Sequence, residues 1–326
     1  MNDTVIAKGP GINGRFKINR FNSVFIILFF LVLATWIYSP EFLTASTVLN
    51  ILRQASALGV LTAGQIIVII AGGVDLSVVA TMQFSIVTYI YFINYFGITG
   101  MIIGVVIALG IGIAMGIVNG IIVTKFNVQP FLVTLFTAQI LTGIRVILTG
   151  IDSAGVVPDE IRTLGNDSTG IIPNAVIILA IIIVLCWIIL NKTLFGRQLV
   201  CVGSNKTAAV FSGINADLTI IKSYCFCSIT AVLASIILSG YTGYADMWIG
   251  EGYEFNTLAA AVIGGNFLGG GKGSIIGALG GVLVITLVLN VVQIFGLDIT
   301  YQYIFTGLIF VAATLIGSLA ARKRAY

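Results

Sequence analysis

Two glycine-containing stretches, AGGVDLS at residues 71–77 and IGGNFLGGGKGS at residues 263–274, interrupt a chain that is otherwise almost wholly apolar. Glycine weakens a helix by about 1 kcal/mol per residue relative to alanine, so we expect both stretches to break helices. In a bilayer, irregular backbone is tolerated only where protein or a water-filled cavity surrounds it. Broken helices of this kind line substrate paths in membrane transporters, so both stretches are candidates for such a path.

The composition predicts an all-α, polytopic membrane protein. Of 326 residues, 58% are hydrophobic and 9% are charged, and the mean hydropathy is +1.11. A soluble domain carries about 25% charged residues, which excludes that class. A spanning helix needs about 20 mostly apolar residues, and on that basis we count about ten transmembrane helices, some of them glycine-broken, at 22–39, 54–72, 76–96, 100–124, 130–148, 174–191, 219–240, 254–268, 274–294 and 300–320.

The basic residues predict cytoplasmic N- and C-termini. Lys and Arg favour short cytoplasmic loops, and in this topology only Arg53, Arg145 and Arg162 fall outside. The predicted domains are a cytoplasmic N-terminal arm (1–21), a single transmembrane domain (22–320) with a long outer loop (149–173) and a long inner loop (191–218), and a basic cytoplasmic tail (321–326).

Neither a metal site nor a nucleotide site is expected in this chain. It has no histidine, and its four cysteines lie in or beside apolar segments. GGGKGS is not a phosphate-binding loop, because Asn266 stands five residues before Gly271, and Gly273 rather than Ser or Thr follows Lys272. No nucleophile, base and oxyanion-binding group can be assembled, so we expect no catalytic residues.

Small residues recur every fourth position in two places, which keeps them on one helix face. One stripe lies in the fourth span, and the other enters the ninth. Missing side chains let another backbone approach closely, within one subunit or between subunits. The two stripes are Gly100, Gly104, Ala108, Gly112, Gly116 and Gly120, and Gly269, Gly273, Gly277 and Gly281.

The inner loop predicts a short amphipathic helix. Ser204 or Asn205 can cap a helix that runs through Phe211 and ends at Gly213. This helix has two possible roles. It could lie at the membrane interface and only fix the topology, or it could dock into a groove on a cytoplasmic partner.

Asp75 stands at the edge of the apolar segments, where a carboxylate is a functional candidate. It could instead cap the helix that follows. Neutral polar residues in or near the spans suit either interhelical hydrogen bonds or a path for a neutral solute. With Asp75, these path candidates are Asn119, Asn256, Asn266, Asn290 and Gln293.

Three stretches occur in the order found in one transporter family. They are AGGVDLS (71–77), GRQLVCVGSNKTAAVFSGI (196–214) and GEGYEFNTLAAAVIGGNFLGGGKGSIIGALGG (250–281). The chain resembles the sugar-type inner-membrane permeases of bacterial ABC importers, which include ribose, xylose, galactofuranose and autoinducer permeases.

The resemblance implies the partners and the location. Two permease subunits, identical or related, would form the path across the bacterial inner membrane. An extracytoplasmic solute-binding protein would deliver the solute, and two cytoplasmic ATPase subunits would bind ATP, so this chain itself would hold no cofactor.

The resemblance also implies site residues. The family's coupling helix, which contacts the ATPase, aligns with Gly203, Ser204, Asn205, Lys206, Thr207, Ala208, Ala209, Phe211 and Gly213. The acid that the family commonly carries at the start of this helix is missing here, where Lys206 and Thr207 precede the two alanines. The broken-helix glycines are Gly72, Gly73, Gly264, Gly265, Gly269, Gly270 and Gly271.

We therefore expect a permease subunit of an ATP-driven importer that moves a small neutral solute, a monosaccharide or related furanose or pyranose. A nucleoside or autoinducer permease of the same type is an alternative. A secondary transporter is another, with Asp75 as its sole plausible ion-coupling site. A membrane-embedded enzyme is the most distant alternative.

Overall fold

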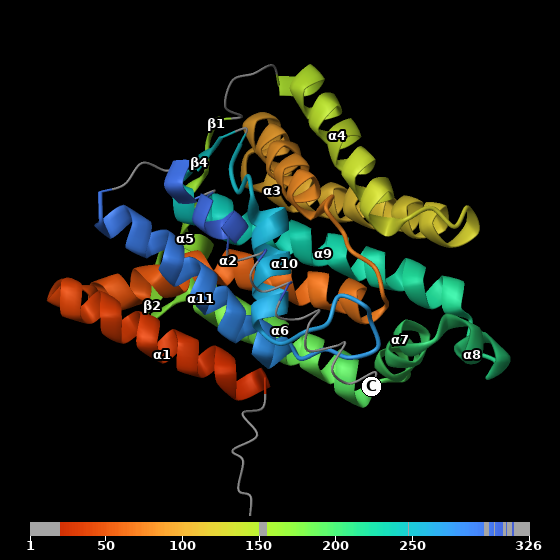
Figure 1. Cartoon of the computed structure of the whole chain (residues 1–326). Helices are drawn as coiled ribbons and strands as arrows, with labels where there is room; N and C mark the ends of the chain where they lie inside the picture. Colours follow the sequence, from red (N-terminus) through yellow and green to blue (C-terminus); the bar gives the residue numbers. More distant parts are fainter. Residues whose placement is uncertain are drawn as a thin grey trace, which may run out of the picture.

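The computed structural model describes residues 20–149, 155–246, 248–296, 300–302, 304–308, 311 and 315. This part of the chain is built almost wholly from helices (Figure 1). They are α1 (Arg20–Tyr38), α2 (Ala45–Ile70), α3 (Val78–Lys125), α4 (Pro130–Thr149), α5 (Asp159–Gly165), α6 (Asn174–Lys192), α7 (Leu194–Ser204), α8 (Lys206–Phe211), α9 (Ala216–Thr242), α10 (Tyr253–Ile263) and α11 (Ile275–Ile294), with a 3-10 turn, η1 (Pro40–Leu43).

Two small antiparallel sheets accompany the helices. The first pairs β1 (Gly155–Val156) with β4 (Tyr244–Ala245), and the second pairs β2 (Ser168–Thr169) with β3 (Ile172–Pro173). Figure 1 places these strands and α5 at one end of the long helices, with α7 and α8 at the opposite end. In the topology predicted from charge, the strands lie outside and α7 and α8 lie inside.

Six helices in the described part are long and apolar enough to cross a membrane: α2, α3, α4, α6, α9 and α11. The all-α polytopic fold is therefore confirmed. α3 holds two of the predicted spans, because Gly97 breaks it with φ 58° and ψ −143°. The two halves fold back on each other, since a Cβ on Gly104 would lie 2.5 Å from the Cα of Tyr89.

Three predicted spans stay open. The apolar part of α1 in the described residues, Val24–Tyr38, is shorter than the six spanning helices, so the span predicted at 22–39 is one of them. α10 has only 11 residues, about 16 Å of helix, and is too short to cross a membrane alone. The span predicted at 300–320 lies mostly outside the described residues. The full span count, the position of the termini and the domain boundaries remain predictions.

The glycine stripe of α3 packs inside this chain. Cβ atoms added at Gly116 and Gly120 would lie 2.6 Å from the Cα atoms of Cys225 and Ile221 in α9. These backbones approach closely because neither glycine has a side chain. This part of the stripe packs α3 against α9, whereas Gly100 and Gly104 pack against the first half of α3. These contacts lie within the chain, as the intrasubunit interpretation predicts.

Only part of the second stripe lies on a helix face. The helix α11 begins after Ser274, whose side chain caps it by accepting the N–H of Gly277 at 3.1 Å. Gly269 and Gly273 therefore lie before α11, in the irregular segment that follows α10. Gly277 and Gly281 do face a neighbouring helix. Their added Cβ atoms would lie 2.3 and 1.9 Å from the carbonyl oxygens of Gly264 and Ala260.

Candidate translocation and coupling site

Three segments far apart in the sequence meet where α2 ends. The carbonyl oxygen of Ile70 accepts the backbone N–H of Gly271 at 2.8 Å. A Cβ on Gly203, in the last turn of α7, would lie 1.8 Å from that same oxygen. We call this contact between Ile70, Gly203 and Gly271 the glycine junction. It joins the break after α2, the end of α7 and the irregular segment between α10 and α11.

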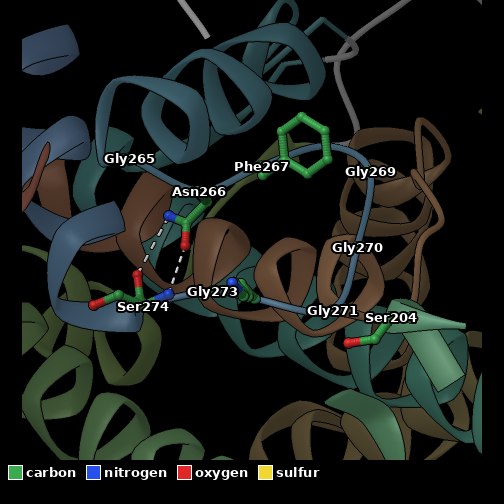
Figure 2. A pocket seen from close by; sticks show the side chains of 11 residues that line it. Ser204, Gly265, Asn266, Phe267, Gly269, Gly270, Gly271, Gly273 and Ser274 are labelled. Atoms are coloured by element: carbon green, nitrogen blue, oxygen red, sulfur yellow. Dashed lines mark hydrogen bonds between the residues drawn. The ribbon is translucent and has the colours of Figure 1, made fainter. Parts of the chain in front are cut away.

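A hollow of about 630 Å³ lies beside the glycine junction (Figure 2). The segment 265–274 forms most of its wall, and Gly203 and Ser204 of α7 complete it. Asn266 holds the two ends of this segment together, because its side-chain oxygen accepts the N–H of Ser274 at 2.5 Å and its amide donates to Ala261 at 2.9 Å. Asn266 therefore shapes the loop and also faces the hollow.

Asp75 lies fully buried in the link between α2 and α3. Its Oδ1 accepts the backbone N–H of Ser77 at 2.8 Å and the Ser77 hydroxyl at 2.6 Å. The capping prediction was wrong in its position: Ser77 is the N-cap residue of α3, and Asp75 binds an N–H that precedes the first helical turn. In the described part of the chain, Oδ2 has no hydrogen-bond partner.

A chain of hydrogen bonds leads from Asp75 to two other segments. The Asn119 amide, in the second half of α3, donates to the Ser77 hydroxyl at 3.0 Å. The Thr137 hydroxyl on α4 donates to Asn119 Oδ1 at 2.7 Å. Because these side chains are buried, the hydrogen bonds satisfy groups that would be costly to leave unpaired. The α2–α3 link is thereby fastened to α3 and α4.

The other predicted path residues lie elsewhere. Asn290 on α11 donates to Gln54 on α2 at 2.9 Å, so it forms an interhelical hydrogen bond. Asn256 is buried in α10, and Gln293 is exposed near the end of α11. The structure thus brings Asp75 and Asn119 together and places the remaining candidates in separate surroundings.

The short helix predicted in the inner loop is present as α8. The Asn205 side chain accepts the N–H of Ala208 at 3.0 Å, and Gly213 follows the helix with φ 81°. Ala209 faces inward, whereas the Phe211 side chain is 87% exposed. The Phe211 ring therefore stands exposed at the end of α8.

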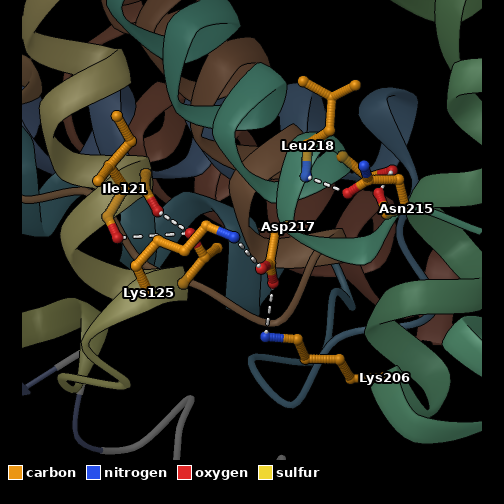
Figure 3. Close-up of polar contacts among 9 residues, drawn as sticks. Ile121, Lys125, Lys206, Asn215, Asp217 and Leu218 are labelled. Carbon is orange, nitrogen blue, oxygen red and sulfur yellow. Dashed lines mark hydrogen bonds and ion pairs between the residues drawn. The ribbon is translucent and has the colours of Figure 1, made fainter.

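Asp217 forms two ion pairs, one that joins α8 to α9 and one that joins α3 to α9 (Figure 3). Asp217, in the first turn of α9, lies 3.1 Å from Lys206 at the start of α8 and 3.2 Å from Lys125 at the end of α3. All three side chains are partly exposed, so each pair contributes about 0–1 kcal/mol. Lys206 stands where the resemblance leads one to expect an acid, and here it binds Asp217 in this chain.

Arg145 was predicted to fall on the outer side, which stays a prediction. Its side chain is buried near the C-terminal end of α4, with 1% of its surface exposed. The signal was available, because Arg145 is the only charged residue within α4 and an ionisable residue inside a span is a functional candidate.

Comparison with known proteins identifies the class. Residues 47–314 match the family described as branched-chain amino acid transport system / permease component, and the chain belongs to this family. No solved structure shows a significant match.

The relatives confirm the resemblance to sugar-type ABC import permeases. The ribose import permease protein RbsC of Bacillus subtilis (strain 168) is 34% identical over 296 residues, covering 90% of this chain and 91% of the relative. RbsC of Escherichia coli (strain K12) is 32% identical, covering 89% and 91%. The D-allose transport system permease protein AlsC of the same strain is 29% identical, covering 91% of each chain.

Proposed function

We propose that this chain is the membrane subunit of an ATP-driven importer that moves a monosaccharide across the bacterial inner membrane. The observation that carries the proposal is the glycine junction, where the segment leading into α8 contacts the break after α2 without an intervening side chain. A displacement of α8 by a cytoplasmic partner would therefore be transmitted to the break after α2. The similarity to ribose and allose permeases supports a monosaccharide as the solute.

The proposal assigns ATP binding to a separate subunit that docks on α8. The exposed Phe211 and Val210 side chains give that partner an apolar contact, and the partly exposed Lys206 lies beside them. We further propose a second permease copy, identical or related, and an outer solute-binding protein. Both termini would lie in the cytoplasm.

The described residues near the break suit a neutral solute. Asn119, Ser77 and Thr137 are uncharged hydrogen-bonding groups, whereas a path for an anion would call for Lys or Arg. Asp75 is occupied on one oxygen by Ser77, which supports a structural role over ion coupling.

The test is reconstitution in proteoliposomes with and without the cognate ATPase and solute-binding protein. We expect the chain alone neither to hydrolyse ATP nor to transport. The complete complex should take up ribose or allose when ATP is supplied, and excess unlabelled nucleoside should not compete. Uptake driven by a proton or sodium gradient without the ATPase would refute the proposal. Competition by nucleoside would show that the solute is a nucleoside and not a monosaccharide.

A further inference from the structure

The backbone between α2 and α3, residues 72–77, is irregular, and we call it the break segment. Gln65, which is fully buried in α2, pairs with the middle of this segment. With its amide nitrogen placed toward the acceptor, Gln65 donates to the carbonyl oxygen of Asp75 at 3.0 Å and accepts the N–H of Asp75 at 3.2 Å. One side chain therefore satisfies both peptide groups of Asp75, as a residue of a neighbouring β-strand would.

Two further helices pair with the residues on either side of Asp75. The Tyr224 hydroxyl on α9 donates to the carbonyl oxygen of Val74 at 3.3 Å. The N–H of Leu76 donates to the Thr134 hydroxyl on α4 at 3.1 Å. A Cβ on Gly73 would lie 2.6 Å from the Tyr224 hydroxyl oxygen, so the glycine leaves the space that this hydroxyl occupies.

These hydrogen bonds make the break segment rigid although it is not helical. Peptide groups inside a bilayer must find their partners within the protein. Here the partners come from α2, α4 and α9, so the segment can change shape only if several buried hydrogen bonds break together. The break after α2 is therefore a fixed element and not a hinge.

The first residue of the break segment lies beside the hollow. Gly72 is exposed, and in the described structure no atom lies within 4 Å of the position that its Cβ would take. A Cβ on Gly270, which lines the hollow, would lie 2.8 Å from the Cα of Gly72. Gln65 thus holds a segment that is buried at Asp75 and open at Gly72.

We propose that Gln65 is a positioning residue of the transport path: by pairing with Asp75 it fixes the break segment as a wall beside the hollow. A displacement that reaches Ile70 through the glycine junction then moves the break segment as one body. The role in transport rests on the proposed function, whereas the rigidity of the segment does not.

Hydrogen–deuterium exchange of the purified protein, read by mass spectrometry, tests the rigidity. The N–H groups of Asp75, Leu76 and Ser77 are hydrogen-bonded, so in the wild type they should exchange as slowly as the flanking helices. Gln65→Met keeps the length of the side chain and removes both hydrogen bonds to Asp75. We expect exchange at residues 74–77 to become about tenfold faster or more. Unchanged exchange there would overturn the proposal.

Gln54→Met is the matched control, because Gln54 is also a glutamine of α2 and pairs with the side chains of Tyr241 and Asn290. Exchange at residues 74–77 should stay at the wild-type rate in this variant. Equal acceleration in Gln54→Met would overturn the proposal. Equal acceleration across α6 and α11 in Gln65→Met would overturn it too, because the protein would then have loosened throughout.

ATP-driven uptake in proteoliposomes tests the positioning role. Gln65→Met should lower uptake by about tenfold or more while the ATPase still co-purifies, because the surface of α8 is unchanged. Gln65→Glu is the conservative variant. In its neutral form, which burial favours, a carboxyl group can donate to the Asp75 carbonyl oxygen and accept the Asp75 N–H.

At about pH 6, with the wild type at the same pH as reference, Gln65→Glu should therefore take up more sugar than Gln65→Met. Wild-type uptake in Gln65→Met, or no gain in Gln65→Glu over Gln65→Met, would overturn the positioning role. Exchange needs neither ATP nor solute. If the wild-type complex itself took up no sugar, the proposed function would fail, and exchange would still decide whether Gln65 holds the break segment.

Discussion

Gly203→Ala tests the glycine junction directly. The new Cβ would lie 1.8 Å from the Ile70 carbonyl oxygen and 2.6 Å from the Gly271 nitrogen. Both are backbone atoms, so no rotamer change relieves the clash. Overpacking costs about 1–3 kcal/mol, and loss of the Gly271–Ile70 hydrogen bond adds about 0.5–1.5 kcal/mol. Alanine returns about 1 kcal/mol of helix propensity in α7. We expect a net loss of about 0.5–3.5 kcal/mol in the free energy of unfolding.

The assay combines thermal melting of the purified complex with ATP-driven uptake in proteoliposomes. Gly203→Ala should melt at a lower temperature and should transport poorly while the ATPase still co-purifies, since α8 keeps its surface. Gly110→Ala is the matched control, because its added Cβ meets no atom within 4 Å in the described structure. That variant should match the wild type in uptake and should melt at the same or a slightly higher temperature, because alanine favours the helix. Wild-type melting and uptake in Gly203→Ala would refute the junction.

Four other substitutions, at three positions, test the remaining features. Phe211→Asp should release the ATPase during purification without lowering the melting temperature, because the side chain is exposed; retention of the ATPase and normal uptake would leave α8 as a topology anchor. Gly277→Leu places a Cβ 2.3 Å from the Gly264 carbonyl oxygen and should destabilise the α10–α11 contact by about 1–3 kcal/mol, which normal assembly and melting would contradict. Asp75→Asn keeps an acceptor for Ser77 and should retain most uptake, whereas Asp75→Ala should lose about 1–3 kcal/mol of stability. Complete loss of uptake in both Asp75 variants with unchanged melting would instead make the charge itself essential.

The sequence predicted those features that depend on residues close together in the chain, such as helix caps and the spacing of glycines along one helix. The cap at Asn205 and the end near Gly213 follow from side-chain and backbone preferences within a few positions, and α8 has both. The α3 stripe follows from fourfold spacing, and the structure places it against α9. Its partner could not be identified from spacing, because any close backbone fits a row of glycines equally well.

Long-range contacts account for what the sequence did not predict. Arg145 was assigned to the outer side because the charge rule counts residues near span ends, but the rule does not predict its burial against Gln83 of α3 and the Trp248 ring. Asp75 lies two residues before the N-cap position, which Ser77 occupies, and Asp75 accepts the Ser77 N–H instead. The meeting of Ile70, Gly203 and Gly271 depends on three segments that only the tertiary fold brings together.

The glycine junction has a mechanical consequence. Side chains between packed helices absorb small displacements by changing rotamer, which damps a movement before it reaches the next element. At Ile70, Gly203 and Gly271 no side chain separates the backbones, so this damping is absent. A small shift of α7 therefore displaces the end of α2 and the segment 265–274 by a similar amount and at the same time. The three segments at the glycine junction are therefore joined as a stiff linkage.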